Sequence, residues 1–145
     1  MKSIMKADLH NHSYYSDGLL SPSEVVRLAS KANCDLFSLT DHDTTDGLDE
    51  AKLEADKVGL NFINGVEISA FWRNMAIHIV GLGVDVNNDI LQAGLEHNKE
   101  LRKIRAEKIA LSLWRSGIKD ALEKAQIISG GHMLTRTHFA QMLIQ

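Results

Sequence analysis

The sequence feature that most constrains this chain is a pair of histidines, His10 and His12, where an apolar segment typical of a buried strand ends. In an extended segment, alternate side chains lie on one face, so both imidazoles can reach one metal ion. Similar groups accompany later apolar segments, in Thr40-Asp41-His42-Asp43, at Glu67 and at His78. One such pair is weak support, but recurring groups of His, Asp and Glu near strand ends predict a metal site.

Strand-like and helix-like segments alternate through the first 84 residues. We expect strands at residues 4–10, 34–40, 60–68 and 75–82, and helices at about 22–32 and 45–58. The first helix begins with a capping box in Ser21-Pro22-Ser23-Glu24. Thr45 or Asp46 caps the second helix, and Gly59 ends it.

This βαβαββ order predicts an α/β fold with a largely parallel sheet. Ligands of such sheets bind outside the carboxyl ends of the strands. His10, His12, Asp41, His42 and Glu67 all fall at predicted strand ends, and this placement supports a shared site independently of any motif.

Helical patterns dominate after residue 85. We expect helices at about 88–116, 119–128 and 135–144, which divides the chain into a sheet-bearing part, residues 1–84, and a helical part, residues 85–145. Four strands cannot close a barrel, so the sequence indicates the N-terminal portion of a longer fold. An uncovered sheet edge favours self-association.

Composition limits the function classes. The chain has 145 residues, 44% hydrophobic residues and a net charge of -3, which gives no overall attraction to nucleic acid. A phosphorylated small molecule or a short oligonucleotide can still bind through a local patch or bound metal ions. The sequence shows no membrane-spanning run and no signal peptide, so we expect a cytoplasmic protein. The single cysteine, Cys34, excludes an internal disulfide and fits a small core residue.

Imidazole and carboxylate donors without thiolates favour Mn, Fe or Zn at a catalytic site. Two or three such ions act as Lewis acids, generate hydroxide at neutral pH and stabilise an in-line displacement at phosphorus. Glu67 is suited to bridge ions because a carboxylate has two oxygens. Asp8 and Asp41 are suited to orient the imidazoles.

Several positions have two interpretations. Asp17 is either a ligand or a cap for the Gly18 turn, and His78 is either a ligand or a core histidine. Tyr14 and Tyr15 either stack on a base or pack in the core. Other residues are expected to be ordinary: the basic residues of the long helix form a solvated face, Asp43 belongs to a turn, and neither His97 nor His132 has a special role.

Five motifs together resemble the PHP (polymerase and histidinol phosphatase) superfamily in order and spacing: Asp8-Leu9-His10-Asn11-His12, Ser16-Asp17-Gly18, Thr40-Asp41-His42-Asp43, Gly65-Val66-Glu67 and His78-Ile79-Val80-Gly81. The segment Thr135-Arg136-Thr137-His138-Phe139-Ala140, after a helical stretch, is similar to the insertion of one branch. That branch hydrolyses nucleoside 3',5'-bisphosphates and short RNA from its 5' end.

The resemblance implies a distorted seven-stranded β/α barrel with a trinuclear metal site and a helical insertion. It implies one ion held by His10, His12 and Glu67, a second by Glu67 and His78, and a third by Asp17 and His42. It also implies substrate-phosphate contacts from Arg136 and His138, which join Glu67 as catalytic candidates. These two residues are separated by two positions and would not share a helix face, so one could precede the helix.

The family completes its site with a later His or Cys and a later Asp-x-His, and the 145 residues contain neither. The predicted function is therefore a metal-dependent phosphoesterase with manganese as the first-choice ion. One alternative is a histidinol-phosphate phosphatase. An alternative of another class is a non-catalytic fragment that binds metal or a partner.

Overall fold

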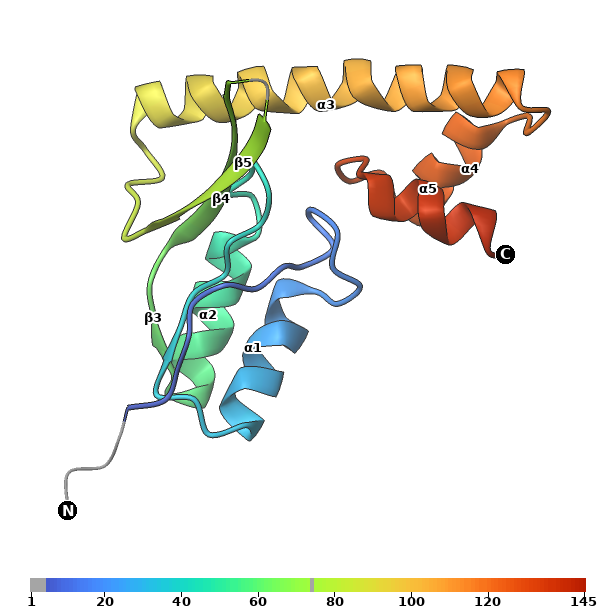
Figure 1. Ribbon diagram of the computed structural model, residues 1–145. Coiled ribbons are helices and arrows are strands. Elements are labelled where there is room, and N and C mark those ends of the chain that lie inside the picture. The colour runs from blue at the N-terminus through green and yellow to red at the C-terminus, as the bar shows by residue number, and fades with distance from the viewer. Residues whose placement is uncertain (1–4, 74) are drawn as a thin grey trace.

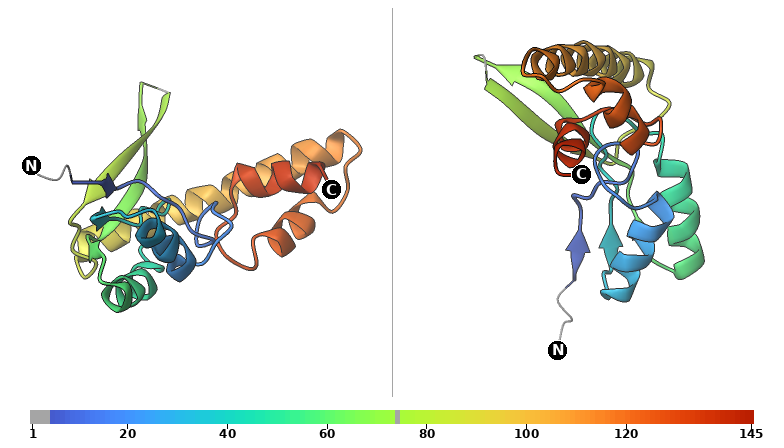
Figure 2. Two further views of the ribbon diagram at one scale, coloured as in Figure 1. Left: turned by 90° about the horizontal axis from the view of Figure 1, so that it is seen from below. Right: turned by 90° about the vertical axis from the view of Figure 1, so that its right-hand side faces the viewer.

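The computed structural model describes residues 5–73 and 75–145 (Figure 1). The elements in chain order are β1 (Ala7–Asp8), α1 (Pro22–Lys31), β2 (Leu36–Phe37), α2 (Leu48–Val58), β3 (Asn61–Phe62), β4 (Gly65–Trp72), β5 (Met75–Leu82), α3 (Asp89–Arg115), α4 (Ala121–Ile128) and α5 (Arg136–Leu143). The long helix α3 joins two regions, because the strands lie near its beginning while α4 and α5 lie near its end (Figures 1 and 2).

The strands form two sheets. β1, β2 and β3 pair in parallel, with Ala7 opposite Leu36 and Phe37 opposite Phe62. β4 and β5 form an antiparallel hairpin in which Trp72 lies opposite Met75. The α/β prediction is confirmed, and the parallel prediction is correct for the first three strands only.

The strand predicted at residues 60–68 is wrong because it is two strands with different partners. β3 pairs with β2, whereas β4 begins at Gly65 and continues to Trp72 because β5 supplies hydrogen-bond partners along its length. A Cβ atom at Gly65 would clash with the Ser38 side chain, so only glycine lets the chain pass this close to Ser38 on its way from β3 to β4. Glu67 therefore lies inside a strand instead of at its end.

The start of β4 also contacts the segment after β2. His42 and Glu67 form an isolated parallel bridge, in which the Glu67 amide donates to Asp41 O at 3.1 Å and the Asp43 amide donates to Glu67 O at 2.9 Å. The predicted strands 4–10 and 34–40 are shorter as regular strands, and residue 4 lies outside the described residues. Beyond the regular strands, backbone hydrogen bonds keep the two segments side by side; for example, the Ser38 amide donates to Asp8 O at 2.9 Å.

Helix ends follow the sequence signals in most places. Ser21 and Glu24 form the predicted capping box of α1, and Gly59 ends α2 in the left-handed conformation. The predicted cap of α2 is wrong: its N-cap is Gly47, and the Thr45 hydroxyl instead accepts a hydrogen bond from Gln92 of α3. Asn88 caps α3 as a side-chain acceptor for the Leu91 amide.

Two apolar clusters hold these elements. The first joins α1, α2 and the parallel strands through Val26, Ala29, Phe37, Leu39, Leu48, Ala51, Ala55 and Leu60, and partly buried Cys34 packs against it. The second joins α3, α4 and α5 through Ala106, Ala121, Ala125 and Phe139. Each fully buried Leu, Val or Phe stabilises its cluster by roughly 2 kcal/mol. None of the helices in residues 5–73 and 75–145 combines the length and apolar character needed to span a bilayer.

Candidate metal centre

The carboxylate of Glu67 lies among four imidazoles. Its Oε2 atom is 3.1 Å from His10 Nε2, 3.1 Å from His12 Nε2 and 3.2 Å from His42 Nδ1, while its Oε1 atom is 3.0 Å from His78 Nδ1. The loop after β1 supplies two of these histidines, the loop after β2 supplies the third, and β5 supplies the fourth. The Glu67 side chain is only 7% exposed, so the imidazoles replace water around a buried carboxylate.

Asp17 completes the cluster from the other side. Its two oxygens lie 3.7 Å from His12 Nδ1 and 3.8 Å from His42 Nε2. A Cβ atom at the next residue, Gly18, would clash with the carbonyl oxygen of His12, so glycine lets this loop fold tightly beside the cluster.

Three overlapping groups offer ligand atoms within 4.8 Å of one another: His10–His12–Glu67, His12–Asp17–His42 and His42–Glu67–His78. The structure thus brings together all six residues that the sequence suggested as metal ligands. Their roles as ligands stay a prediction. Compared with the resemblance, the geometry adds His12 to the group of Asp17 and His42, and it adds His42 to the group of Glu67 and His78.

The donors of this cluster fit a cation. Within the described residues, His42 Nδ1 is buried and makes no hydrogen bond, although Glu67 Oε2 lies 3.2 Å away, because the angles are unsuitable. An unpaired buried polar atom costs about 1–3 kcal/mol, and an ion between these two atoms would remove that cost.

The protonation states also suit metal binding. Burial, together with the nearby Arg102 guanidinium, lowers the pKa of His42 to about 4, so this imidazole is neutral at pH 7. Burial acts to raise the pKa of Glu67, but the hydrogen bond to His10 and the nearby imidazoles of His42 and His12 hold it below its ordinary value. A neutral imidazole and an ionised carboxylate are the forms that bind metals.

Asp41 and Asp8 hold the loops that carry these residues. Asp41 is buried, and it accepts hydrogen bonds from the Ser13 amide at 2.7 Å, the Ser13 hydroxyl at 2.6 Å and the Ser16 hydroxyl at 2.6 Å. Ser16 Oγ in turn lies 3.3 Å from His12 Nδ1, so Asp41 reaches an imidazole through a serine. Burial raises the pKa of Asp41 although these hydrogen bonds oppose the shift. Asp8 accepts from the Asn11 side chain at 2.9 Å.

A buried polar network behind the cluster was missed by the sequence reasoning. Arg102 of α3 donates from Nε to Asp43 Oδ2 at 2.6 Å and from Nη2 to Ser69 Oγ at 2.8 Å. Asp43 also accepts from the Ser69 amide at 2.7 Å and from Asn98 at 2.9 Å. Burial acts to raise the pKa of Asp43, but the hydrogen bonds from Ser69 and Arg102 lower it overall.

This network corrects two expectations. Arg102 was expected on a solvated face, but it is only 6% exposed, and Asp43 ties α3 to β4 instead of merely forming a turn. One signal was available, because Asn98 and Arg102 are four residues apart and share a helix face. Their partners are more than 25 residues away in sequence, so no local pattern could identify them.

Arg136 and His138 both lie in α5, so the suggestion that one precedes the helix is wrong. Arg136 is exposed. His138 is buried, and its Nδ1 accepts a hydrogen bond from the Thr135 amide at 3.1 Å, which caps the helix. Burial lowers the pKa of His138, and nearby Asp17 opposes that shift. Contact of either residue with a substrate phosphate stays a prediction.

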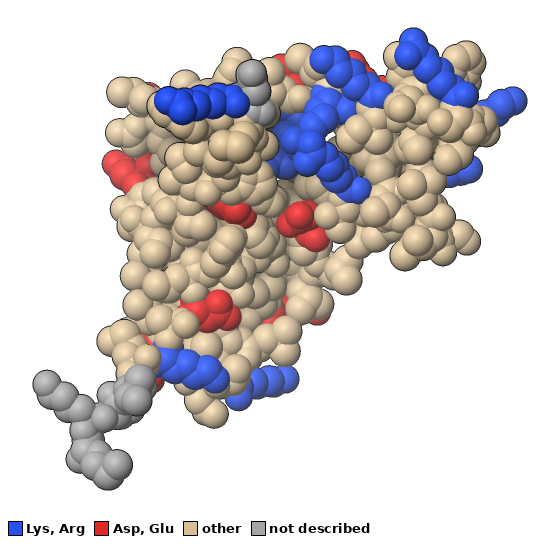
Figure 3. Space-filling model, viewed as in Figure 1, with Lys and Arg blue, Asp and Glu red and all other residues tan. Residues whose placement is uncertain are grey.

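A basic cavity of about 260 Å³ opens beside the cluster. Its lining includes His78 and the cations Arg102, Arg105, Lys108 and Arg136, and no Asp or Glu lines it among the described residues. Lys and Arg side chains gather in this hollow below α3 (Figure 3). Burial and the like charges of Arg102 and Arg136 lower the pKa of Arg105. Arg102 is paired with Asp43, but no carboxylate in the described lining faces Arg105, Lys108 or Arg136, and such crowded cations favour an anionic ligand.

Comparison with known proteins gives the family of this α/β fold and histidine-rich site. The PHP domain model matches residues 8–126, and the chain belongs to this family of PHP domain proteins. The motif resemblance is thereby confirmed.

Two curated relatives are similar at the level of sequence. The chain is 44% identical over 140 residues to a 5'-3' exoribonuclease of Haemophilus influenzae, covering 97% of this chain and 51% of that protein. It is 44% identical over 138 residues to a 3',5'-nucleoside bisphosphate phosphatase of Chromobacterium violaceum, covering 94% and 48%. The chain therefore spans about half the length of the curated relatives it matches.

A solved structure agrees with these relatives. An amidohydrolase from Chromobacterium violaceum, determined with bound sulfate and no metal, superposes with a TM-score of 0.91 at 43% identity. The match covers 96% of this chain and 49% of that one. Family, fold and cluster together define a PHP domain with candidate metal-binding groups of His, Asp and Glu.

Proposed function

We propose that this chain carries the metal-binding part of a phosphoesterase that hydrolyses phosphate esters of nucleotides or short RNA. The activity would be of the 3',5'-nucleoside bisphosphate phosphatase or 5'-3' exoribonuclease type. The observation that carries the proposal is the Glu67 carboxylate shared by four imidazoles beside a basic cavity without carboxylates. The printed activities of the two relatives support it.

The cofactors in this proposal are two or three divalent ions, with manganese first and iron or zinc as alternatives. His10, His12 and Glu67 would hold one ion, Glu67, His78 and His42 a second, and Asp17, His42 and His12 a third. Bound ions would supply Lewis-acid stabilisation of the charge that develops at phosphorus and would lower the pKa of water.

The protein side chains have separate tasks in this proposal. Arg136, with Arg105 and Lys108, would bind phosphate oxygens in the basic cavity, where a guanidinium can donate two parallel hydrogen bonds. Glu67 would fix the positions of the ions relative to one another, because its carboxylate contacts imidazoles from three separate segments. Asp41 and Asp8 would keep those segments in place through their hydrogen bonds to the loops.

The proposal includes an architecture and a setting. Residues 1–84 would form part of a distorted seven-stranded β/α barrel, and residues 85–145 would be a helical insertion; the two separate apolar clusters support this division. Apolar side chains of the hairpin, including Phe71 at 70% exposure, support self-association. A cytoplasmic location remains part of the proposal.

The test is a metal and substrate panel on the purified chain. After manganese reloading, we expect two or more ions per chain and release of phosphate or nucleotide from adenosine 3',5'-bisphosphate or a 5'-phosphorylated RNA trimer, in preference to histidinol phosphate. His12→Ala should lose both properties because His12 belongs to two ligand groups, while His97→Ala, an exposed histidine of α3, should retain them. A folded chain with neither bound metal nor activity would contradict the proposal and favour the non-catalytic alternative.

A further inference from the structure

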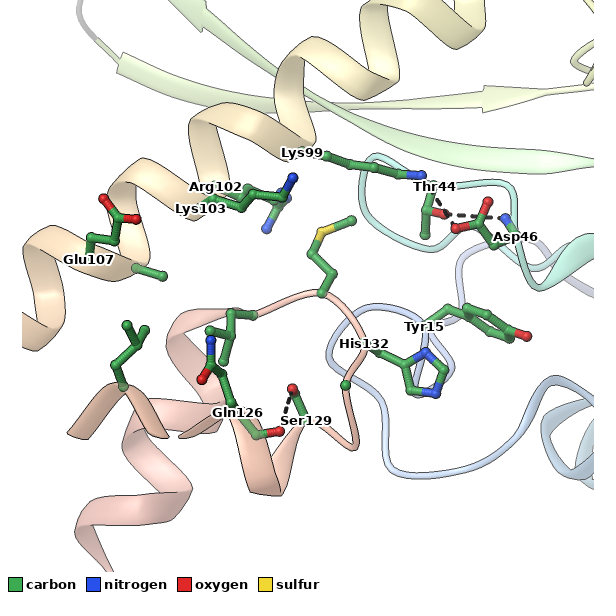
Figure 4. A pocket seen from close by; sticks show the side chains of 15 residues that line it. Tyr15, Thr44, Asp46, Lys99, Arg102, Lys103, Glu107, Gln126, Ser129 and His132 are labelled. Atoms are coloured by element: carbon green, nitrogen blue, oxygen red, sulfur yellow. Dashed lines mark hydrogen bonds and ion pairs between the residues drawn. The ribbon is translucent and has the colours of Figure 1, made fainter. Parts of the chain in front are cut away.

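A second cavity, of about 590 Å³, lies between α3 and α4. None of the six metal candidates is among the described residues that line it. Figure 4 shows side chains of α3 along one side, α4 with its C-terminal loop opposite, and the loops after β1 and β2 at one end. Its volume is in the range of about 300–1,000 Å³ that is typical of small-molecule sites.

The cavity has an apolar wall. Ala106 of α3, Leu122 of α4, and Met133 and Leu134 of the following loop line it. Ala106 is fully packed in the second apolar cluster, and Leu122 and Leu134 pack against the same cluster, so this wall is held by the core. Such a surface favours a ligand with an apolar face over a free phosphate ion.

Aromatic rings stand at one end of the cavity. The His132 ring stacks on Tyr14, with centroids 4.6 Å apart and an interplanar angle of 18°, and its centroid is 4.8 Å from that of Tyr15. Gly130 and Gly131 precede it with positive φ angles, which let the loop turn back over the tyrosines. Tyr15 and His132 both line the cavity, and planar bases stack readily on such rings.

Polar groups complete the lining. Gln126 lines the cavity from the exposed side of α4, and its side-chain amide can both donate to and accept from the edge of a base. Lys99 and Lys103 line the α3 side of the cavity. Lys99 pairs with Asp46 at 3.3 Å, and Lys103 pairs with Glu100 at 3.0 Å. Both ion pairs are solvent-accessible and therefore weak.

The cavity borders the metal centre through two loops. Tyr15 is two residues from Asp17, and Thr44 is two residues from His42, so each loop faces the metal centre with one residue and the cavity with another. Arg102 lines both this cavity and the basic one. The two cavities and the candidate metal centre are therefore neighbours in the structure.

We propose that this cavity binds a nucleobase of the nucleotide or short RNA whose phosphate lies at the metal centre. The proposal rests on the proposed function for the identity of the ligand. The physical basis is the combination of an apolar wall, stacked rings at one end and the Gln126 amide in the lining. In this proposal, His132 and Gln126 contact the base, and the Tyr15 ring stacks on it.

Adenosine, which carries no phosphate, tests this site by calorimetric titration of the 145-residue chain without metal. We expect saturable binding that weakens at least tenfold in Gln126→Trp, since the bulky indole would occupy part of the space available to a base. Lys124→Trp is the matched control, because Lys124 is also exposed on α4 but does not line the cavity, and its affinity should stay within twofold. Circular dichroism checks that both variants fold.

Two further variants separate this inference from the proposed function. His42→Ala removes a metal candidate and should leave adenosine binding within twofold even if all hydrolysis is lost. Lys108→Ala alters only the basic cavity and should also leave it unchanged. No saturable binding, equal binding by Gln126→Trp, loss of binding in Lys108→Ala, or complete competition by inorganic phosphate would each overturn the proposal.

Discussion

The metal centre and the helical region use their polar residues in opposite ways. At the candidate metal centre, donors as many as 57 residues from Glu67 in sequence surround its carboxylate, and few of their contacts stabilise a helix. In the helical region, His138 caps a helix and Arg102 holds α3 to β4. The difference teaches that a histidine in a functional motif can have its nearest contacts with its own helix, while an arginine outside the motifs can join two regions of the molecule.

The largest expected effect comes from the shared carboxylate. Glu67→Gln keeps the size of the side chain but removes the negative charge that faces four imidazoles, so retained manganese should fall to less than one ion per chain. Phosphoesterase activity, where present, should fall by about a thousandfold or more. Metal analysis and phosphate release measure the two effects. Glu100→Gln, an exposed glutamate of α3, is the control and should change neither.

The next effect tests the link between the two regions. Arg102→Met removes one partner of the buried Asp43 ion pair and leaves a carboxylate without its cation, which should cost about 3–5 kcal/mol of unfolding free energy. Lys103→Met, at the adjacent exposed position, should change it by about 0.5 kcal/mol or less. Urea denaturation measures both. Equal values for the two variants would show that the network does not join the regions.

A smaller effect is expected in the basic cavity. Arg105→Gln removes a cation that lies near Arg102 and Arg136, so KM for a phosphorylated substrate should rise by about 10–100-fold, the equivalent of one hydrogen bond to a charged group. Steady-state kinetics measure this change, and Arg115→Gln at the exposed end of α3 serves for comparison. An unchanged KM would place the substrate phosphate elsewhere.

The helix cap of α5 predicts a pH dependence. Burial lowers the pKa of His138, so protonation is less favourable in the folded state, and the stability from its neutral ring is lost as pH falls below about 6.5. His138→Gln keeps an acceptor at the capping-box position and should lose less stability between pH 7 and pH 5 than the wild type. Thermal melts at both values measure the difference, and His97→Gln should behave as the wild type does.

The smallest effect concerns association through the hairpin. Ile79 on β5 is 51% exposed, and Ile79→Lys should shift sedimentation towards the monomer because a charge opposes apolar contact between copies. Leu111→Lys replaces an apolar residue of similar exposure on α3, 47%, and should have no such effect. A wild-type chain that sediments as a monomer at all concentrations would contradict the expectation.

The sequence by itself determined the alternation of strands and helices, the helix ends at Ser21 and Gly59, and the set of side chains in the candidate metal centre. These features have local causes. A capping box or a left-handed glycine acts within one turn, and residues that leave parallel strands at the same edge of a sheet meet there. His10, His12 and His42 could therefore be grouped before any coordinates were known.

Only the tertiary structure decided where β4 finds its partner, what Arg102 and His138 contact, and where the two cavities lie. Glu67 enters the cluster from the middle of a strand because β5 pairs with the whole of β4. Arg102 is buried because Asp43 and Ser69 come to it from distant segments. Such contacts depend on loops that bring remote residues together, and no periodicity in the sequence encodes those distances.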